Sequence, residues 1–140
     1  MNYKKQLTSI MILLSCVGCA SIETMVDAYL MKYDPVEYKL IVDIRTIAML
    51  AKDKCDDVES SKKTALRLSH LSIELMNFSE YQPHNKPVKE SSVDLNNIVQ
   101  GLKTQYYSDK PVSPAFCKIK FKSIEDTAIK IQQMEGSKPK

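Results

Sequence analysis

The four cysteines of this 140-residue chain are its residues best suited to chemistry, because thiols form disulfides and accept covalent modification. Cys16 and Cys19 end an uncharged N-terminal stretch, whereas Cys55 and Cys117 are far apart in the sequence. Neither Cys55 nor Cys117 belongs to a Cys-x-x-Cys motif, and the two histidines lack the spacing of a metal-binding pair, so we expect no metal site. The cysteines therefore fall into two pairs with different expected roles.

Residues 1–18 have the layout of a secretory signal. Lys4 and Lys5 give a cationic start, and the stretch from Gln6 to Ile22 carries no charge and has an apolar centre. A permanent transmembrane helix is the alternative, but it needs about 20 mostly apolar residues, and polar residues interrupt this run. We therefore expect export followed by cleavage.

The residues at the end of this segment, Leu13-Leu14-Ser15-Cys16-Val17-Gly18-Cys19, resemble the lipobox of bacterial lipoprotein precursors. That pattern has an apolar residue three positions before the cysteine and a small residue just before it. The resemblance implies cleavage by the lipoprotein signal peptidase. It also implies that a cysteine carrying fatty acyl chains, such as palmitate, becomes the new N-terminus.

Two cysteines compete for this modification. Cys16 has Leu13 at the apolar position and Ser15 before it, whereas Cys19 follows Gly18. If Cys19 is acylated, Cys16 leaves with the signal and the mature chain keeps one even pair of thiols. If Cys16 is acylated, Cys19 remains as an odd thiol in an oxidising compartment. We therefore favour Cys19 as the lipidation site and keep Cys16 as the alternative.

The composition sets limits on the class of protein. Without residues 1–18, the remaining 122 residues are enough for one small domain. The formal charge is +3, and removing Lys4 and Lys5 leaves 18 basic against 17 acidic residues, so no nucleic-acid partner is expected. Gly is scarce and Trp is absent, which disfavours phosphate-binding loops and β-hairpins. A helical domain is the expected class.

Apolar residues at helical spacing predict four long helices. Asp34-Pro35 and Ser113-Pro114 are typical helix starts, with Glu37 expected to reach back to the N-cap. Pro83 and Pro87 predict a break over Gln82–Glu90. The expected helices run from Pro35 to near Cys55, from about Ser60 to Tyr81, from Ser91 or Ser92 to Tyr107, and from Pro114 to Gly136. Residues 19–34 are expected to form the tether, with a short amphipathic helix over Ile22–Tyr33, before a bundle of residues 35–136 and a tail of residues 137–140.

Four amphipathic helices with short connections predict an all-α, up-down-up-down four-helix bundle. In this topology the end of the first helix and the start of the fourth lie at the same pole, on neighbouring corners. Cys55 and Cys117 fall at these two places, each on an inward stripe. Together with export, this position predicts a Cys55–Cys117 disulfide.

The opposite pole is expected to contain the tether, the loop around Pro83 and the tail. Its lysines could face anionic lipid head groups, or the loop and tail could simply be solvated. These membrane-proximal lysines are Lys86, Lys89, Lys138 and Lys140. His70 and His84 have no catalytic context and are expected at the surface, so we predict neither catalysis nor a cofactor.

These features predict a small, non-catalytic lipoprotein of the cell envelope that binds an unknown envelope protein. The lipoprotein resemblance implies the periplasmic face of the outer membrane, or the cell surface, because Ala20 rather than aspartate follows Cys19. The overall plan also resembles small lipoproteins of tailed bacteriophages, which implies a role in lysis, as an outer spanin-like subunit, or in superinfection exclusion. A periplasmic ligand-binding protein or enzyme is a further alternative.

Overall fold

The computed structural model describes residues 30–140, which form four α-helices and a short 3-10 turn. The elements are α3 (Pro35–Ala51), η1 (Lys52–Lys54), α4 (Val58–Tyr81), α5 (Lys86–Tyr106) and α6 (Pro114–Gly136). The predicted all-α class is therefore confirmed for this part of the chain. The segment 1–18, both lipidation candidates and most of the expected helix over Ile22–Tyr33 lie outside the described residues.

Two helices begin at the predicted cap followed by proline. The Asp34 carboxylate accepts hydrogen bonds from the backbone N–H groups of Val36 (2.8 Å) and Glu37 (3.1 Å). Ser113 Oγ accepts one from the N–H of Phe116 at 3.2 Å. In each helix the proline occupies the first position, where its missing N–H would have had no partner in the helix.

The first two helices differ from prediction by a few residues at their junction. Helix α3 ends at Ala51, and the expected continuation to Cys55 is the tighter turn η1. Helix α4 begins at Val58, two residues before the expected start, because Asp57 is the N-cap and accepts from the Ser60 N–H at 2.9 Å. The negative charge of Asp57 also stabilises the helix, because it lies next to the positive end of the helix dipole.

The predicted start of the third helix at Ser91 or Ser92 is wrong. Helix α5 begins at Lys86, so the break covers only residues 82–85. Pro87 lies in the first turn of the helix, where a proline removes no helical hydrogen bond. Ser92 is buried inside the helix and donates to the carbonyl of Lys89 at 2.8 Å.

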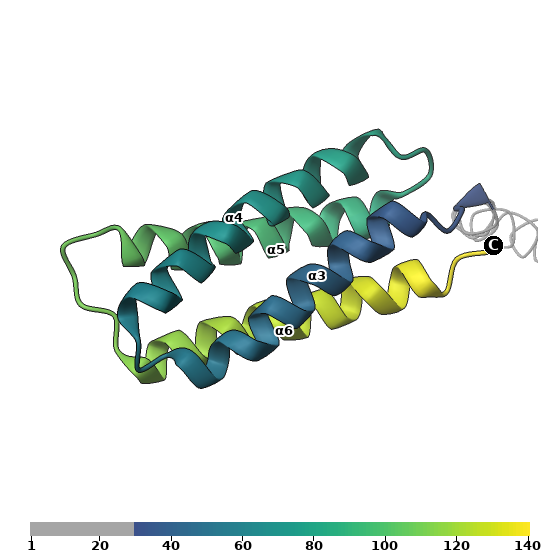
Figure 1. Cartoon of the computed structure of the whole chain (residues 1–140). Coiled ribbons are helices and arrows are strands. Elements are labelled where there is room, and N and C mark those ends of the chain that lie inside the picture. Colours follow the sequence, from purple (N-terminus) through teal and green to yellow (C-terminus); the bar gives the residue numbers. More distant parts are fainter. Residues whose placement is uncertain (1–29) are drawn as a thin grey trace, which may run out of the picture.

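The four helices close into a ring in which each packs against two neighbours: α3 against α4 and α6, and α5 against α4 and α6. Figure 1 shows α4 and α5 side by side above α3 and α6, with successive helices running in opposite directions. This is the up-down-up-down arrangement expected for short connections. It leaves two poles. We call the one with residues 30–37, 79–89 and 135–140 the tether pole, and the one with Cys55 and Cys117 the disulfide pole.

The core comes from the predicted inward stripes of all four helices. Ile47, Leu71, Phe78 and Ile98 are only partly buried and pack against the core. Ile41, Leu68, Leu95, Leu102, Phe121 and Ile124 are among the fully buried side chains. In the described part of the chain, no helix is both long enough and apolar enough to cross a bilayer.

Candidate functional site

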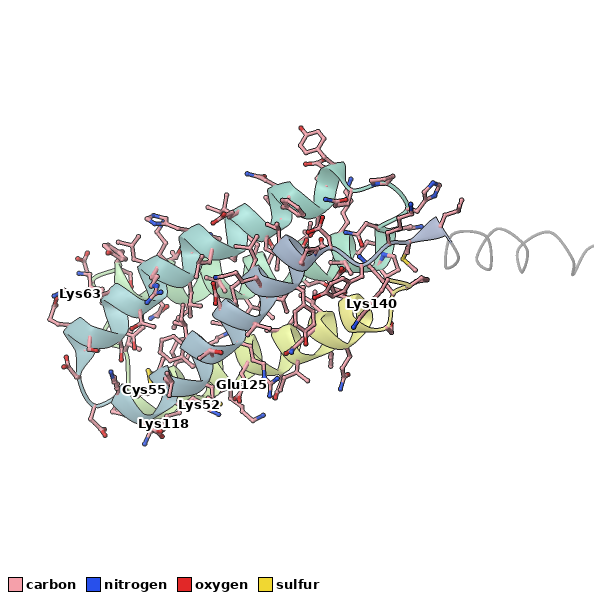
Figure 2. All side chains as sticks on the ribbon, turned by 45° about the vertical axis from the view of Figure 1, so that its right-hand side comes forward. Lys52, Cys55, Lys63, Lys118, Glu125 and Lys140 are labelled. Atoms are coloured by element: carbon pink, nitrogen blue, oxygen red, sulfur yellow. A yellow bond between two sulfur atoms is a disulfide. The ribbon has the colours of Figure 1, made fainter. Side chains whose placement is uncertain are left out.

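The disulfide pole contains the predicted bond between Cys55 and Cys117. Their sulfur atoms lie 2.01 Å apart and their Cα atoms 5.7 Å apart, within the range that disulfides require. Both residues are almost fully buried, and Cys117 Sγ lies 3.7 Å from Ser61 Oγ. Figure 2 shows Cys55 at the end of the molecule opposite Lys140, next to the ion pair of Lys52 and Glu125. The bond closes the pole where α3, α4 and α6 meet.

The tether pole contains a group of buried polar side chains that we call the carboxylate cluster: Glu37, Ser79, Asn85, Glu135 and Lys138. Glu37 Oε1 accepts hydrogen bonds from Ser79 Oγ (2.5 Å) and Asn85 Nδ2 (2.8 Å). Lys138 Nζ donates to Glu37 Oε2 (3.1 Å) and Asn85 Oδ1 (2.6 Å), and it forms an ion pair with Glu135. Helices α3, α4 and α6, the loop before α5 and the tail therefore meet in one network.

The prediction that Glu37 reaches back to its N-cap is wrong. The backbone N–H of Asp34, the donor that Glu37 was expected to take, instead donates to Glu135 Oε1 at 2.7 Å. Glu37 lies four residues before Ile41, on the inward stripe of α3, so its side chain enters the bundle and is fully buried.

The expectation that the Lys138 side chain faces head groups or solvent is also wrong. Its side chain is 4% exposed, because two carboxylates neutralise its ammonium inside the cluster. Lys86 and Lys89 are exposed but paired, with Glu90 at 3.8 Å and Glu80 at 3.6 Å. Lys140 is exposed at the same pole, with its ammonium 5.8 Å from the centre of the Tyr33 ring. The positive potential of this pole is therefore smaller than its number of lysines suggests.

The pKa of Glu135 is raised to about 7, first by burial and second by a hydrogen bond with the Glu37 carboxyl. The hydrogen bonds from Lys138 and from the Asp34 backbone act in the opposite direction. Glu135 Oε2 makes no hydrogen bond of good geometry, but it touches the Lys138 ammonium. This contact still stabilises the ionised carboxylate, because the attraction between opposite charges does not depend on the angle of a hydrogen bond. One proton shared by the two carboxyl groups would make the cluster neutral.

A hollow of about 500 Å³ lies beside the cluster. Its lining includes Leu30, Tyr33 and Asp34 from the start of the described chain, and Gln82 and His84 from the loop before α5. Gln82 Nε2 donates to Asp34 Oδ2 at 3.3 Å across this hollow. His84 is exposed, and its φ of 57° lies in the left-handed region, which fixes the turn that brings Asn85 inward.

Polar side chains also join α4 to α5 near the middle of both helices. Ser72 Oγ donates to Asn96 Oδ1 at 2.9 Å, and Gln100 Nε2 donates to Ser69 Oγ at 2.9 Å. Because serines are small, they let the two helices approach while the amides of α5 satisfy their hydroxyl groups. These hydrogen bonds fix the register of α4 against α5.

His70 is exposed on α4, as expected. Among residues 30–140, no group of three His, Cys, Asp or Glu side chains is placed to hold a metal ion. Comparisons with protein-family models, curated proteins and solved structures find no match to this chain.

The sequence contained a signal for the carboxylate cluster that the helix patterns alone did not assign. Glu37 extends the inward stripe of α3 by one turn before Ile41, and Glu135 extends that of α6 by one turn after Ile131. Both extensions fall at the same pole of the predicted bundle. A buried carboxylate requires a cation, and Lys138 is the nearby basic residue that could reach both.

Proposed function

We propose that this chain is a lipid-anchored, non-catalytic interaction module of the cell envelope. The carrying observation is the pairing of an N-terminal lipobox-like pattern, Leu13–Cys19, with a buried disulfide in the bundle. The pattern supports acylation, and the disulfide supports export because such bonds persist mainly in oxidising compartments. The buried ionisable groups of the described domain contact one another, which suits a structural role for them.

We further propose that the tether pole faces the membrane. The chain enters the bundle there, through residues 30–34, and an anchor on Cys19 would be only a short tether away. Lys32, Lys140 and the exposed ring of Tyr81 lie at this pole and suit an interface with head groups. The disulfide pole and the sides of the four helices would then be available to a protein partner in the envelope.

Lipid anchoring is tested with the full chain produced in a Gram-negative host. We expect the Cys19→Ser form to accumulate as unprocessed precursor, and the Cys16→Ser form, its matched control, to be processed normally. Mass spectrometry of the mature N-terminus should find an acylated Cys19. Acyl chains on Cys16 would reassign the site, and a free amine at both positions would reject the anchor.

The interaction role is tested by crosslinking the lipidated protein in intact envelopes and identifying what is captured. We expect one envelope protein to be enriched over a control lipoprotein, in an amount that falls when the protein is released from the membrane. Equal recovery with the control would argue against a specific partner.

A further inference from the structure

The carboxylate cluster fastens the tail to the start of α3. Lys138 reaches inward from the tail to Glu37, while the carbonyl of the next residue, Pro139, accepts a hydrogen bond from the Tyr33 N–H at 3.0 Å. Beside this bond, the Asp34 N–H donates to Glu135 Oε1 at 2.7 Å. The side-chain cluster, one backbone–backbone bond and one bond from a backbone N–H to the Glu135 carboxylate therefore hold the C-terminal end of the chain against the start of α3.

The charges inside the cluster do not balance when both carboxyl groups are ionised. Glu37 and Glu135 are then two buried anions in contact with one ammonium, that of Lys138. The surrounding charged or titratable groups are Lys32, Tyr33 and Asp34 before α3, Glu80 and Lys89 from α4 and α5, His84 from their loop, and Lys140 from the tail. Lys32 is exposed to solvent. Glu80 pairs with Lys89, Asp34 caps α3, and Lys140 lies over Tyr33. The cluster keeps one excess negative charge, which burial disfavours.

We propose that the carboxylate cluster is a proton-binding latch: one proton shared by Glu37 and Glu135 keeps the tail closed on the start of α3, and losing it favours opening. The proton would form the hydrogen bond between the two carboxyl groups and leave Glu37 and Lys138 as a neutral pair. This inference needs neither the lipid anchor nor a partner, so it can hold or fail independently of the proposed function.

The direction of the pH effect follows from linkage. The raised pKa of Glu135, about 7 against an ordinary 4.5, means that the closed state binds a proton which the open state releases. The latch therefore opens more easily as the pH rises from about 4.5 to about 7. Above pH 7 Glu135 is ionised in both states, so it favours opening no further. Because the tail closes over residues 30–34, the latch sets whether the tether leaves the bundle in a fixed direction.

Amide hydrogen exchange of the full chain in detergent micelles tests the latch. We expect the protection factors of the Tyr33 and Asp34 amides to fall by tens of fold between about pH 5 and pH 8, after correction for intrinsic exchange. The Cys117 amide, which donates to the Ser113 carbonyl at the disulfide pole, is the internal control. Its protection factor should not change with pH. Equal protection of Tyr33 and Asp34 at both pH values would overturn the proposal.

Glu135→Gln supplies the variant, because a glutamine resembles the protonated acid and cannot ionise. We expect its Tyr33 and Asp34 amides to keep the same protection at both pH values. Glu125→Gln, which changes another buried carboxylate of α6, should retain the wild-type pH dependence. If Glu135→Gln keeps that dependence, the latch is rejected. If this variant does not fold, carbon NMR titration of wild-type Glu135 decides: a midpoint near 4.5 rejects the latch and one near 7 supports it.

Discussion

The backbone N–H of Asp34 donates a hydrogen bond to Glu135 Oε1 at 2.7 Å and so joins residues 101 positions apart. Asp34 is also the N-cap of α3, so this bond ties the start of the first described helix to the end of the last. Glu135 shares the buried cluster with Glu37 and Lys138. The bundle is thus closed by a polar network at one pole and by a covalent bond at the other.

The first prediction concerns the pH dependence of global stability. Because the folded-state pKa of Glu135 is raised from 4.5 to about 7, the native state binds more protons than the unfolded state between these values. Its contribution to the free energy of unfolding therefore falls as the pH rises through this window, by about 3 kcal/mol in total. Urea denaturation at several pH values, for wild type and Glu135→Gln, should show this difference.

The matched control for this measurement is Glu74→Gln, which removes an exposed carboxylate from α4. It should follow the wild-type curve at every pH, because an exposed side chain has nearly the same surroundings in both states. A stability difference between wild type and Glu135→Gln that is flat from about pH 4.5 to pH 8 would show that Glu135 titrates normally.

The second prediction concerns the cation of the cluster. Lys138→Met leaves two buried carboxylates without their ammonium, and breaking a buried pair from one side costs about 3 kcal/mol or more. We expect the loss to be largest near pH 8 and smaller near pH 5, where a proton can replace part of the missing charge. Lys140→Met, two residues on and exposed, should cost less than about 1 kcal/mol. Equal losses for the two variants would mean that Lys138 is not held in the cluster.

Most of the helical architecture could be predicted because it depends on local patterns. Two helix starts and the inward stripes followed from cap residues and from apolar spacing, and the Cys55–Cys117 pair followed from the topology. The start of α5 did not, because Pro87 has the same sequence appearance whether it breaks a helix or occupies its first turn. The distinction depends on how the chain continues in space.

The carboxylate cluster was not predicted because its members are unremarkable one at a time. Glu37 fits a capping pattern, and Lys138 lies in a polar tail. Their roles appear only when the bundle brings α3, α6 and the tail to one pole. There Glu37 is buried at the end of an inward stripe, and its carboxylate needs the cation that Lys138 supplies. Sequence patterns describe one helix at a time, whereas this site is shared by five segments.

The third prediction tests the helix propensity of α5. Gly101 lies in the interior of this helix, and a Cβ added there would meet no atom within 4 Å. Gly101→Ala should therefore stabilise the protein by about 1 kcal/mol, since alanine loses less backbone entropy than glycine when the helix forms. Thermal unfolding followed by circular dichroism would measure the gain. A loss of stability would indicate that another surface packs on this position in solution.

The last prediction tests the disulfide, which depends on export, topology and helix phase together. The bond closes a loop with a sequence separation of 62, which the loop-entropy model values at about 4 kcal/mol. Reduction, or the double substitution Cys55→Ala with Cys117→Ala, should lower the melting temperature by more than about 10 °C, because a domain of this size has a small unfolding entropy.

Peptide mapping without reductant locates the bond in protein taken from the cell envelope. We expect a single crosslinked peptide pair that joins Cys55 to Cys117. Because the disulfide is buried, reductant should act slowly on the folded protein and quickly once urea opens the bundle. If both residues carried free thiols, the disulfide would no longer support export to an oxidising compartment. The helix packing would remain, since the apolar core extends along all four helices, well beyond the two cysteines.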